Sequence, residues 1–472
     1  MQVDYTRDAF LTDFSKATLR DRYLLPDEQN QDLFARVGSF YQNTDDVDHG
    51  QRLYDYMSKG WFMPATPVLS NGGTDRGLAI SCFLNESDDD MPGIAETWDE
   101  NIWLAQKGAG IGTYWGNVRS IGERIGKVGK SSGVIPFMKV QDSLTLAVSQ
   151  GSLRRGSAAL YLPIHHPEVE EFIDMRRPTG GDPNRKALNL HHGLAIDDEF
   201  MRAVNYDEPY NLRSPKDGSV VETISARDLW AKILTTRLET GEPYMLFIDT
   251  VNHAIPEHHK KLGLKVKTSN LCVEITLPTG RDHLGKNRTA VCCLSSVNLE
   301  KYDEWKHDEN FILDIMYFLD NVLQDFIDHA PDSHAKAKYA AMRERSVGLG
   351  VMGLHYLYQQ RNLAFGSKEA YALNKEVFKH FHKKVQEANL TIGLDRGANP
   401  DFIEADMKVG PRRFSNCTAI APTASISIIC GGTSPGVEPS MANVFVQKTL
   451  SGSFEVHNPY LQKLLKNYGK DD

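Results

Sequence analysis

The chain has 472 residues, of which 41% are hydrophobic and 24% charged, and its formal net charge at pH 7 is -9. This composition is typical of a folded globular protein and excludes a disordered or collagen-like chain, while the negative charge argues against a nucleic-acid partner. Neither a signal peptide nor a membrane span is predicted, because the sequence offers no apolar leader and no apolar run of about 18 residues. We therefore expect a cytoplasmic protein of a bacterial or bacteriophage-infected cell, with no membrane partner.

The beginning of the chain differs in texture from the rest. Residues 1–60 are polar with helical spacing and predict a helical region. From residue 61 to 472 short apolar runs alternate with Gly and Pro, and the stretches 224–240, 310–330 and 369–397 have helical patterns. This alternation predicts one large α/β domain after the helical region.

Six cysteines are widely scattered, at Cys82, Cys272, Cys292, Cys293, Cys417 and Cys430. Such spacing is unlike the disulfide framework of a small secreted domain, so reduced thiols are expected and a disulfide would be a step in chemistry. Neither C-x-x-C nor H-E-x-x-H occurs, so we expect no metal site in this chain.

A glycine-rich run, Gly108-Ala109-Gly110-Ile111-Gly112, resembles a dinucleotide fingerprint only in part. Position 113 is Thr where G-x-G-x-x-G requires its third glycine. A dinucleotide site is therefore not expected. The glycines more simply permit close packing of backbone against backbone.

Residues 269–278 alternate apolar and polar side chains with a period of two, which predicts a β-strand. Its polar face would carry Asn270, Cys272 and Glu274 in a row, about 7 Å apart. In an α/β core such a face requires a polar cavity, although an edge strand with one face in solvent fits the pattern equally well.

A second predicted strand, 290–299, contains Cys292 and Cys293, whose side chains would point to opposite faces. Either thiol alone is more typical of a buried structural cysteine. Residues 421–426 offer hydroxyls and backbone N–H groups that suit a diphosphate if they open a helix. On pattern alone, an ordinary helix cap is as good an interpretation.

Six segments, in this order, resemble the successive signatures of the ribonucleotide reductase large subunit: TPVLSNGG with SC, GAGIG, SQGSLRRGSAA, SNLCVEI, CLSSVNL, and APTASIS with GVEP. The resemblance runs from about residue 60 to the end. It implies a ten-stranded α/β barrel of the ribonucleotide reductase and glycyl-radical type, with a central finger loop that carries a radical cysteine.

The resemblance also implies catalytic roles. Cys272 would take a hydrogen atom from C3′ of the substrate ribose, Glu274 would be the general base toward the 3′-hydroxyl, and Asn270 would hold the ribose hydroxyls. Cys82 and Cys292 would be the thiol pair that reduces the substrate and ends as a disulfide. Cys293 is the alternative partner of Cys82.

Binding roles follow in the same way. Substrate-contact positions implied by the resemblance are Thr66, Ser81, Gly110, Arg154, Pro422, Thr423, Ala424, Ser425 and Ile426. Asp88, Asp89 and Arg119 would bind a dNTP or ATP specificity effector at a homodimer interface. The acidic run at 88–90 is otherwise typical of a solvated turn.

The resemblance implies a ribonucleoside diphosphate substrate, a radical supplied by a metal-containing small (beta) subunit, and a thioredoxin- or glutaredoxin-like reductant. No cofactor is expected in this chain, and adenosylcobalamin is the alternative radical source. About 60 residues precede the first motif, too few for an ATP-cone domain. The family normally continues beyond the segment after GVEP, so we expect a complementary C-terminal fragment, a truncated sequence or a reduced family member.

Two further alternatives remain. A non-enzymatic nucleotide-binding piece of a split reductase is compatible with the short C-terminal end. A glycyl-radical enzyme is less well supported, because no R-V-x-G type context occurs near the end of the chain.

Overall fold

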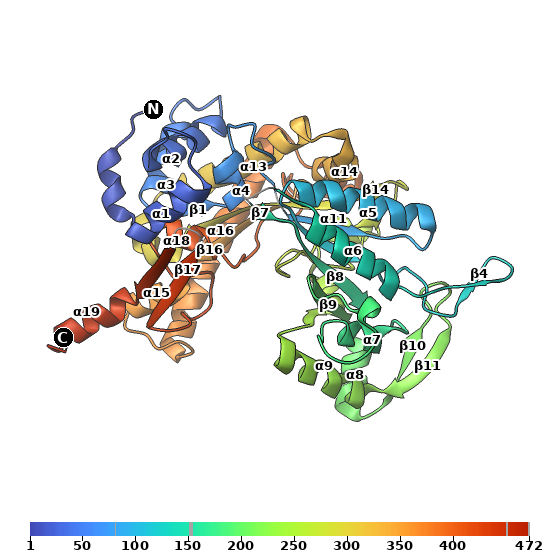
Figure 1. Cartoon of the computed structure of the whole chain (residues 1–472). Helices are drawn as coiled ribbons and strands as arrows, with labels where there is room; N and C mark the ends of the chain where they lie inside the picture. Colours follow the sequence, from blue (N-terminus) through green and yellow to red (C-terminus); the bar gives the residue numbers. More distant parts are fainter. Residues whose placement is uncertain (81, 151–153, 450–451, 471–472) are drawn as a thin grey trace.

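The computed structural model describes residues 1–80, 82–150, 154–449 and 452–470 (Figure 1). The chain begins with four helical elements, η1 (Tyr5–Phe10), α1 (Asp13–Arg22), α2 (Asn30–Phe40) and α3 (His49–Ser58), as expected for residues 1–60. Thr12 caps α1 by accepting a hydrogen bond from the Ser15 backbone, and a capping box closes the start of α2. Helices α2 and α3 pack on each other through buried apolar side chains.

One eight-stranded sheet forms the centre of the molecule. Its strands are β1 (Phe62–Pro64), β2 (Cys82–Glu86), β3 (Gly110–Tyr114), β8 (Ser157–Pro163), β9 (His191–Ile196), β12 (Tyr244–Phe247), β15 (Ala290–Asn298) and β16 (Val347–Met352). The strands from β2 to β12 run parallel in the order β2-β3-β8-β9-β12. The long strand β15 pairs antiparallel with β1 and β2 and parallel with β16. The α/β sheet with a helical region before it agrees with the expected fold class, with eight strands joined among the described residues where the resemblance implies ten.

The long helices of this region are α5 (Met91–Gln106), α6 (Ile135–Ala147), α9 (Ala226–Thr240), α13 (Phe311–His329), α14 (Ala335–Glu344) and α16 (Lys368–Arg396). Of these, α5, α6, α13 and α14 pack on the sheet, and α16 packs on α13. Three of them, α9, α13 and α16, confirm the helical stretches expected at 224–240, 310–330 and 369–397. Strands β3, β8 and β16 are buried almost throughout, as parallel strands between helices usually are.

Shorter elements complete the fold. The helical ones are α4 (Thr66–Asn71), α7 (Val169–Asp174), η2 (Pro183–Arg185), α8 (Asp198–Tyr206), α10 (Ile248–Ala254), α11 (Glu257–Lys261), η3 (Leu299–Lys301), α12 (Tyr302–Trp305), η4 (Asp332–His334), α15 (Leu354–Gln360), α17 (Pro400–Glu404), α18 (Ile426–Ile429) and α19 (Pro459–Asn467). The two-stranded hairpins are β4 (Arg124–Ile125) with β5 (Gly129–Lys130), β6 (Ser149–Gln150) with β7 (Arg154–Arg155), β10 (Pro209–Arg213) with β11 (Val220–Ser225), β13 (Gly280–Arg281) with β14 (Asn287–Arg288), and β17 (Val444–Thr449) with β18 (Gly452–His457). No helix in the described part of the chain is long and apolar enough to cross a bilayer.

The strand predicted at 269–278 is wrong. The segment is a loop with a turn at residues 271–273, where Val273 has a φ of 68°. Its alternating pattern has another cause, because the two limbs pack toward opposite sides. Leu271 and Val273 contact side chains of β3, β8 and β12, whereas Ile275 and Leu277 pack with residues of β2 and β15. We call residues 269–277 the finger loop.

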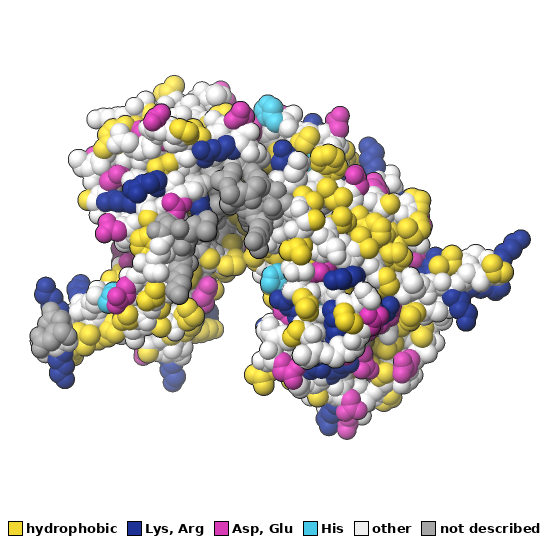
Figure 2. All heavy atoms as spheres, viewed as in Figure 1, with side chains coloured by type: hydrophobic (Ala, Val, Ile, Leu, Met, Phe, Trp, Pro, Cys, Tyr) yellow, Lys and Arg dark blue, Asp and Glu magenta, His cyan; other side chains and the backbone are white. Residues whose placement is uncertain are grey.

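Apolar side chains also gather on one outer face of the molecule. Figure 2 shows them over α5 and α6, where the exposed large residues are Met91, Trp103, Val140 and Leu146. A contiguous apolar surface on a folded protein is typical of an interaction site.

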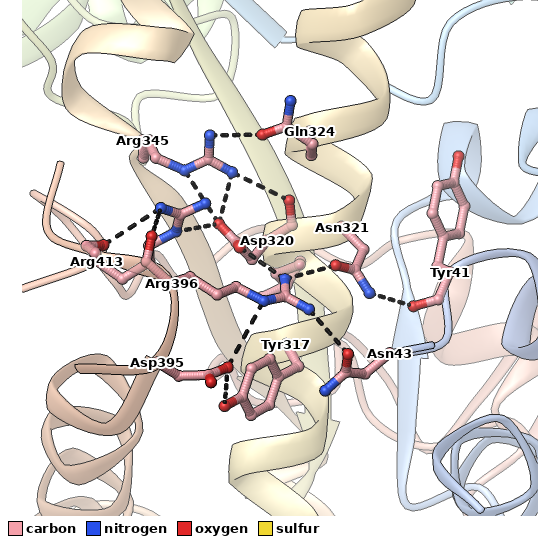
Figure 3. A network of polar contacts seen from close by, with 12 residues as sticks. Tyr41, Asn43, Tyr317, Asp320, Asn321, Gln324, Arg345, Asp395, Arg396 and Arg413 are labelled. Atoms are coloured by element: carbon pink, nitrogen blue, oxygen red, sulfur yellow. Dashed lines mark hydrogen bonds and ion pairs between the residues drawn. The ribbon is translucent and has the colours of Figure 1, made fainter. Parts of the chain in front are cut away.

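A buried charge network ties three helices to the segment that follows α17. Figure 3 shows Asp320 of α13 surrounded by Arg345, Arg396 and Arg413. Its carboxylate lies 2.7 Å from Arg345 Nη2, 2.8 Å from Arg396 Nη1 and 2.9 Å from Arg413 Nε. Burial raises the pKa of Asp320, but the arginines outweigh burial and hold this pKa below its ordinary value.

Replacing Asp320 with Ala should lower the free energy of unfolding by about 3–5 kcal/mol, because it leaves buried guanidinium groups without their counter-ion. Urea unfolding followed by circular dichroism measures this change. Asp395→Ala is the matched control: Asp395 contacts Arg396 and Tyr317 from a half-exposed position, and its loss should cost less than about 1 kcal/mol. Equal losses in the two variants would contradict the importance given to the buried charge.

Candidate active site

A cavity of about 340 Å³ lies where β2, β15, α4, the finger loop and residues 421–426 meet. Of the residues predicted to form the site, it brings together Cys82, Cys272, Glu274, Thr66, Pro422, Thr423, Ala424, Ser425 and Ile426. Residues separated by more than 300 positions in the chain thus border one space. Cys272 occupies the turn of the finger loop and is exposed, so this structure does not enclose the thiol that the resemblance implies as the radical site.

Cys82 and Cys292 lie directly opposite each other in the antiparallel pairing of β2 with β15. Directly opposed residues of such strands have Cα atoms about 4.5–5.5 Å apart, within the range that a disulfide spans. No disulfide joins these two described residues in the structure. Cys293 points to the other face of β15, where its sulfur lies 3.8 Å from the Leu319 carbonyl oxygen of α13.

The environments of the two opposed thiols differ. Cys82 is partly exposed and borders the large cavity, whereas the Cys292 side chain is buried. Burial raises the pKa of Cys292 well above its ordinary value, and the nearby Cys82 and Glu274 raise it further. Cys292 is therefore a protonated thiol at neutral pH.

Glu274 borders two cavities. It lines the large one together with Cys272, and it also lines a second cavity of about 40 Å³ together with Cys292. Its Oε2 atom is buried and has no hydrogen-bond partner among the described residues. Burial raises the pKa of Glu274, and the neighbouring Asn270 side chain offsets part of that effect.

Asn270 does not border the large cavity. Its Oδ1 accepts a hydrogen bond from the Ile275 backbone at 3.2 Å, and its carbonyl oxygen accepts one from the Tyr161 hydroxyl at 2.7 Å. The Nδ2 atom is buried without a hydrogen-bond partner in the described part of the chain. In this arrangement Asn270 closes the base of the finger loop, beside Glu274.

The glycine-rich run lets the finger loop approach the sheet. A Cβ atom on Gly112 of β3 would lie 1.8 Å from the Ser269 carbonyl oxygen. Close packing of backbone on backbone, expected for these glycines, is therefore observed. Gly110 is buried and pairs with Cys82 across the β2–β3 register without bordering the cavity.

Residues 421–426 connect a strand-like segment to a short helix. Residues 416–418 run beside β16, where the Val347 and Leu349 backbone N–H groups donate to Asn416 and Cys417 carbonyl oxygens. The Thr423 hydroxyl accepts a hydrogen bond from the Gly436 backbone at 2.7 Å, so this side chain shapes the loop. The loop then opens α18 at Ile426, as the diphosphate interpretation requires.

Three cations at the cavity were not predicted from the sequence: Arg22, Arg76 and Lys107. Arg76 is oriented by the carbonyl oxygens of Tyr23 and Leu24, at 3.3 and 2.9 Å from its Nη1 and Nη2 atoms. Arg22 lies outside the motifs recognised in the sequence, and Arg76 and Lys107 lie beside such motifs without belonging to them. Only the tertiary fold brings them to the cavity, where they face a single carboxylate, that of Glu274.

Two predicted substrate contacts cannot be placed. Ser81 lies outside the described residues, and so does the side chain of Arg154, whose backbone belongs to β7. Of the predicted effector residues, Asp89 and Arg119 form an ion pair of 2.7 Å, and the Arg119 backbone donates to Asp89 at 2.9 Å. Asp88 borders a separate small cavity with Glu86 and Lys336.

Comparison with known proteins gives a consistent result. The family model "Ribonucleotide reductase, all-alpha domain" matches residues 9–77, and "Ribonucleotide reductase, barrel domain" matches 80–412 and 403–472. The chain is 39% identical to a ribonucleoside-diphosphate reductase large subunit of Invertebrate iridescent virus 3, over 98% of this chain and 79% of the relative. It is 43% identical to a putative large subunit of Frog virus 3, over 89% and 72%. The solved class Id alpha subunit from Actinobacillus ureae is similar with a TM-score of 0.85 at 31% identity, covering 100% of this chain and 81% of that one.

The buried Glu274 carboxyl predicts a specific dependence of stability on pH. Because its pKa is raised in the folded chain, its stabilising contribution is complete below the ordinary pKa of a glutamate and is lost as the pH rises through the folded pKa. Glu274→Gln removes this loss, so the variant should gain stability over the parent chain at pH 8 but not near pH 4.5. Urea unfolding at both pH values measures the difference.

The control for this measurement is Glu170→Gln, which changes a half-exposed carboxylate on α7. Its effect on the free energy of unfolding should stay within about 0.5 kcal/mol at both pH values. A gain for Glu274→Gln that is the same at both pH values would contradict the assignment of a raised pKa.

Proposed function

Since this chain belongs to the ribonucleotide reductase large-subunit family, we propose that its cavity reduces ribonucleoside diphosphates to 2′-deoxyribonucleoside diphosphates by a thiyl-radical mechanism. The catalytic subunit of a ribonucleoside-diphosphate reductase is the function that the names of its relatives carry. One observation supports the mechanism most strongly: the finger-loop thiol Cys272 borders the same cavity as Cys82, which is paired with Cys292.

The first step is assigned to the finger loop. A thiyl radical on Cys272 takes the hydrogen atom from C3′ of the ribose, which is feasible because an S–H bond is close in strength to an activated sugar C–H bond. Glu274 accepts the proton of the 3′-hydroxyl. A carboxylate whose pKa has been raised toward the working pH is well suited to this role. Asn270 would support the ribose and Glu274 from the base of the loop.

The second step uses the opposed thiols. The 2′-hydroxyl leaves as water, and the thiol groups of Cys82 and Cys292 supply two hydrogen atoms and become a disulfide. Cys272 recovers its radical when its hydrogen atom returns to C3′. The raised pKa of Cys292 keeps that thiol protonated until it is used. The strand register supports Cys292 rather than Cys293 as the partner of Cys82.

The cations at the cavity support a phosphorylated substrate. The cavity is lined by three cations, Arg22 and Arg76 of the N-terminal region and Lys107 at the end of α5. Residues 421–426 line the same cavity, and their backbone N–H groups would be further donors to a phosphate. Guanidinium groups bind phosphate oxygens well because their donors match the geometry of the anion. Thr66, Ser81, Gly110 and Arg154 stay predicted substrate contacts.

Large subunits of this family work with a small subunit that supplies the radical, and we propose the same partner, containing a metal centre, for this chain. The names of the relatives favour this partner over adenosylcobalamin. A thioredoxin- or glutaredoxin-like dithiol would regenerate the thiols.

A dNTP or ATP effector would bind near Asp88, Asp89 and Arg119. The exposed apolar face of α5 and α6 supports a homodimer (Figure 2).

Cys272→Ser should reduce dithiol-driven conversion of ribonucleotides to background, because a serine hydroxyl does not form a stable enough radical to exchange hydrogen atoms with the ribose. The measurement is deoxyribonucleotide formation by the chain reconstituted with its radical-generating subunit. Cys430→Ser is the control: its side chain can still donate to the Gly60 carbonyl oxygen, and the activity should be retained. Turnover by Cys272→Ser would overturn the proposed mechanism.

Arg22→Gln should weaken binding of a ribonucleoside diphosphate about tenfold, since a charged hydrogen bond contributes about 1.5–3 kcal/mol. Binding of the unphosphorylated nucleoside should stay the same. Isothermal calorimetry with both ligands separates the two effects. Arg20→Gln, two residues away on α1 and outside the cavity, serves as the control, and an equal loss in both variants would argue against a phosphate site.

A further inference from the structure

A buried carboxyl group that the proposed mechanism does not use lies close to the thiol pair. Glu344 ends α14, is 1% exposed and has an Oε1 atom without a hydrogen-bond partner among the described residues. Its Oε2 atom accepts a hydrogen bond from the Ser346 hydroxyl at 3.1 Å. A buried carboxyl oxygen without a hydrogen-bond partner lowers the stability of the folded chain, and such atoms are rare in folded proteins.

Ser346 connects this carboxyl group to Cys292. The parallel register begins with the pair Cys293–Val347, so the preceding residues, Cys292 and Ser346, are lateral neighbours just before it. A Cβ atom on Gly348 would lie 3.2 Å from Cys292 Sγ, which places the sulfur over this end of β16. Glu344 is also close enough to contribute to the raised pKa of Cys292.

The second cavity completes the connection. It has a volume of about 40 Å³ and is bordered by Cys292, Ser346, Asn416, Thr418 and Glu274. A space of this size with several polar groups can hold a water molecule. Asn416 Nδ2 lies 3.3 Å from the Ser346 hydroxyl and so fixes one wall. Hydroxyl, water and thiol can therefore form one hydrogen-bonded path from Glu344 to Cys292.

We propose that Glu344 is the proton donor to Cys292 when the Cys82–Cys292 disulfide is reduced, and that Ser346 and the small cavity carry the proton. This inference rests on the thiol pair of the proposed function. Of the two paired cysteines, Cys82 borders the large cavity and Cys292 does not, so the thiolate of an external dithiol attacks Cys82 Sγ. The disulfide bond breaks, its electron pair goes to Cys292 Sγ, and the Glu344 proton neutralises that buried thiolate.

The remaining steps balance the reaction. The second thiol of the reductant attacks the reductant sulfur that is bonded to Cys82. Cys82 Sγ leaves and takes up the proton of that thiol, and the reductant's disulfide closes. Two electrons have then passed from the external dithiol to the cysteine pair. The Glu344 carboxylate recovers its proton from solvent through the small cavity, and that proton replaces the one lost by the attacking thiol.

Burial and the neighbouring charged groups set the protonation state of the Glu344 carboxyl group. Burial raises the pKa of Glu344 to about 8; Arg288 of β14 lowers it and Asp401 of α17 raises it. Arg288 is itself occupied by Asp401 and Asp282, at 2.6 and 3.0 Å. Asp401 in turn contacts Arg343 of α14 and lies 3.9 Å from His259 of α11, and Cys292 of β15 interacts electrostatically with Glu344. The carboxyl is thus protonated at neutral pH.

The test uses the full chain without a radical source. The thiols are oxidised with diamide, reduced with dithiothreitol, quenched by alkylation at set times, and the Cys82–Cys292 peptide is followed by mass spectrometry. Glu344→Gln should slow reduction at pH 7 by roughly 100-fold, since general acid catalysis typically contributes at least that much. The rate per dithiothreitol thiolate should fall above about pH 8 in the parent chain and be flat in the variant.

Matched variants separate proton delivery from a structural effect. Glu168→Gln alters another buried carboxyl, one that accepts hydrogen bonds from Val134 and Ile121 backbone groups away from the thiols, and should leave the rate and its pH profile unchanged. Ser346→Ala should reproduce the loss seen in Glu344→Gln, and Ser346→Thr should restore the pH profile. These serine variants decide the question if Glu344→Gln fails to fold.

The experiment distinguishes a failure of the proposed thiol pair from a failure of the proton-donor role of Glu344. If oxidation of the parent chain never yields a Cys82–Cys292 disulfide, the thiol pair of the proposed function is wrong, and this inference falls with it. If the disulfide forms but Glu344→Gln or Ser346→Ala is reduced at the parental rate with the parental pH profile, only the proton-donor role is overturned.

Discussion

The pairing of β2 with β15 is the constraint on which the site depends. Because Cys82 and Cys292 oppose each other in this register, a shift by one residue would turn one thiol to the opposite face and replace it with a neighbour such as Cys293. The finger loop depends on the same sheet, since Gly112 of β3 leaves room for the Ser269 carbonyl oxygen. The thiols of Cys272 and Cys82 thereby border one cavity, and the thiol of Cys292 is held opposite Cys82 by the strand pairing.

Burial sets the chemistry of these groups. Cys292 and Glu344 both have raised pKa values because little solvent reaches them, and both are therefore proton carriers in their neutral forms. Other buried charges serve the scaffold: Asp320 holds three arginines, and Arg288 lies between two aspartates. Among the described residues, three buried carboxyl oxygens lack a hydrogen-bond partner: those of Glu274 and Glu344 lie near the thiols, and that of Glu168 lies elsewhere.

Much of this arrangement could be predicted from the sequence, and the exceptions have physical causes. Long helices such as α13 could be predicted from the helical spacing of their apolar residues. The ordered motifs indicated the family and most of the residues that line the cavity. The finger loop was mistaken for a strand because its limbs bury apolar side chains on opposite sides, which imitates a period of two. Arg22, Arg76 and Lys107 escaped prediction because only tertiary structure brings them to the cavity, and the choice between Cys292 and Cys293 required the strand register.

The most direct test of the account is a single turnover of the prereduced chain with its radical-generating partner and one ribonucleoside diphosphate, in the absence of external dithiol. Rapid quenching followed by peptide mapping counts deoxyribonucleotide and disulfide in the same sample. The proposed mechanism predicts equal amounts of product and of a disulfide that joins Cys82 to Cys292. Product without that disulfide, or a disulfide that contains Cys293, would contradict it.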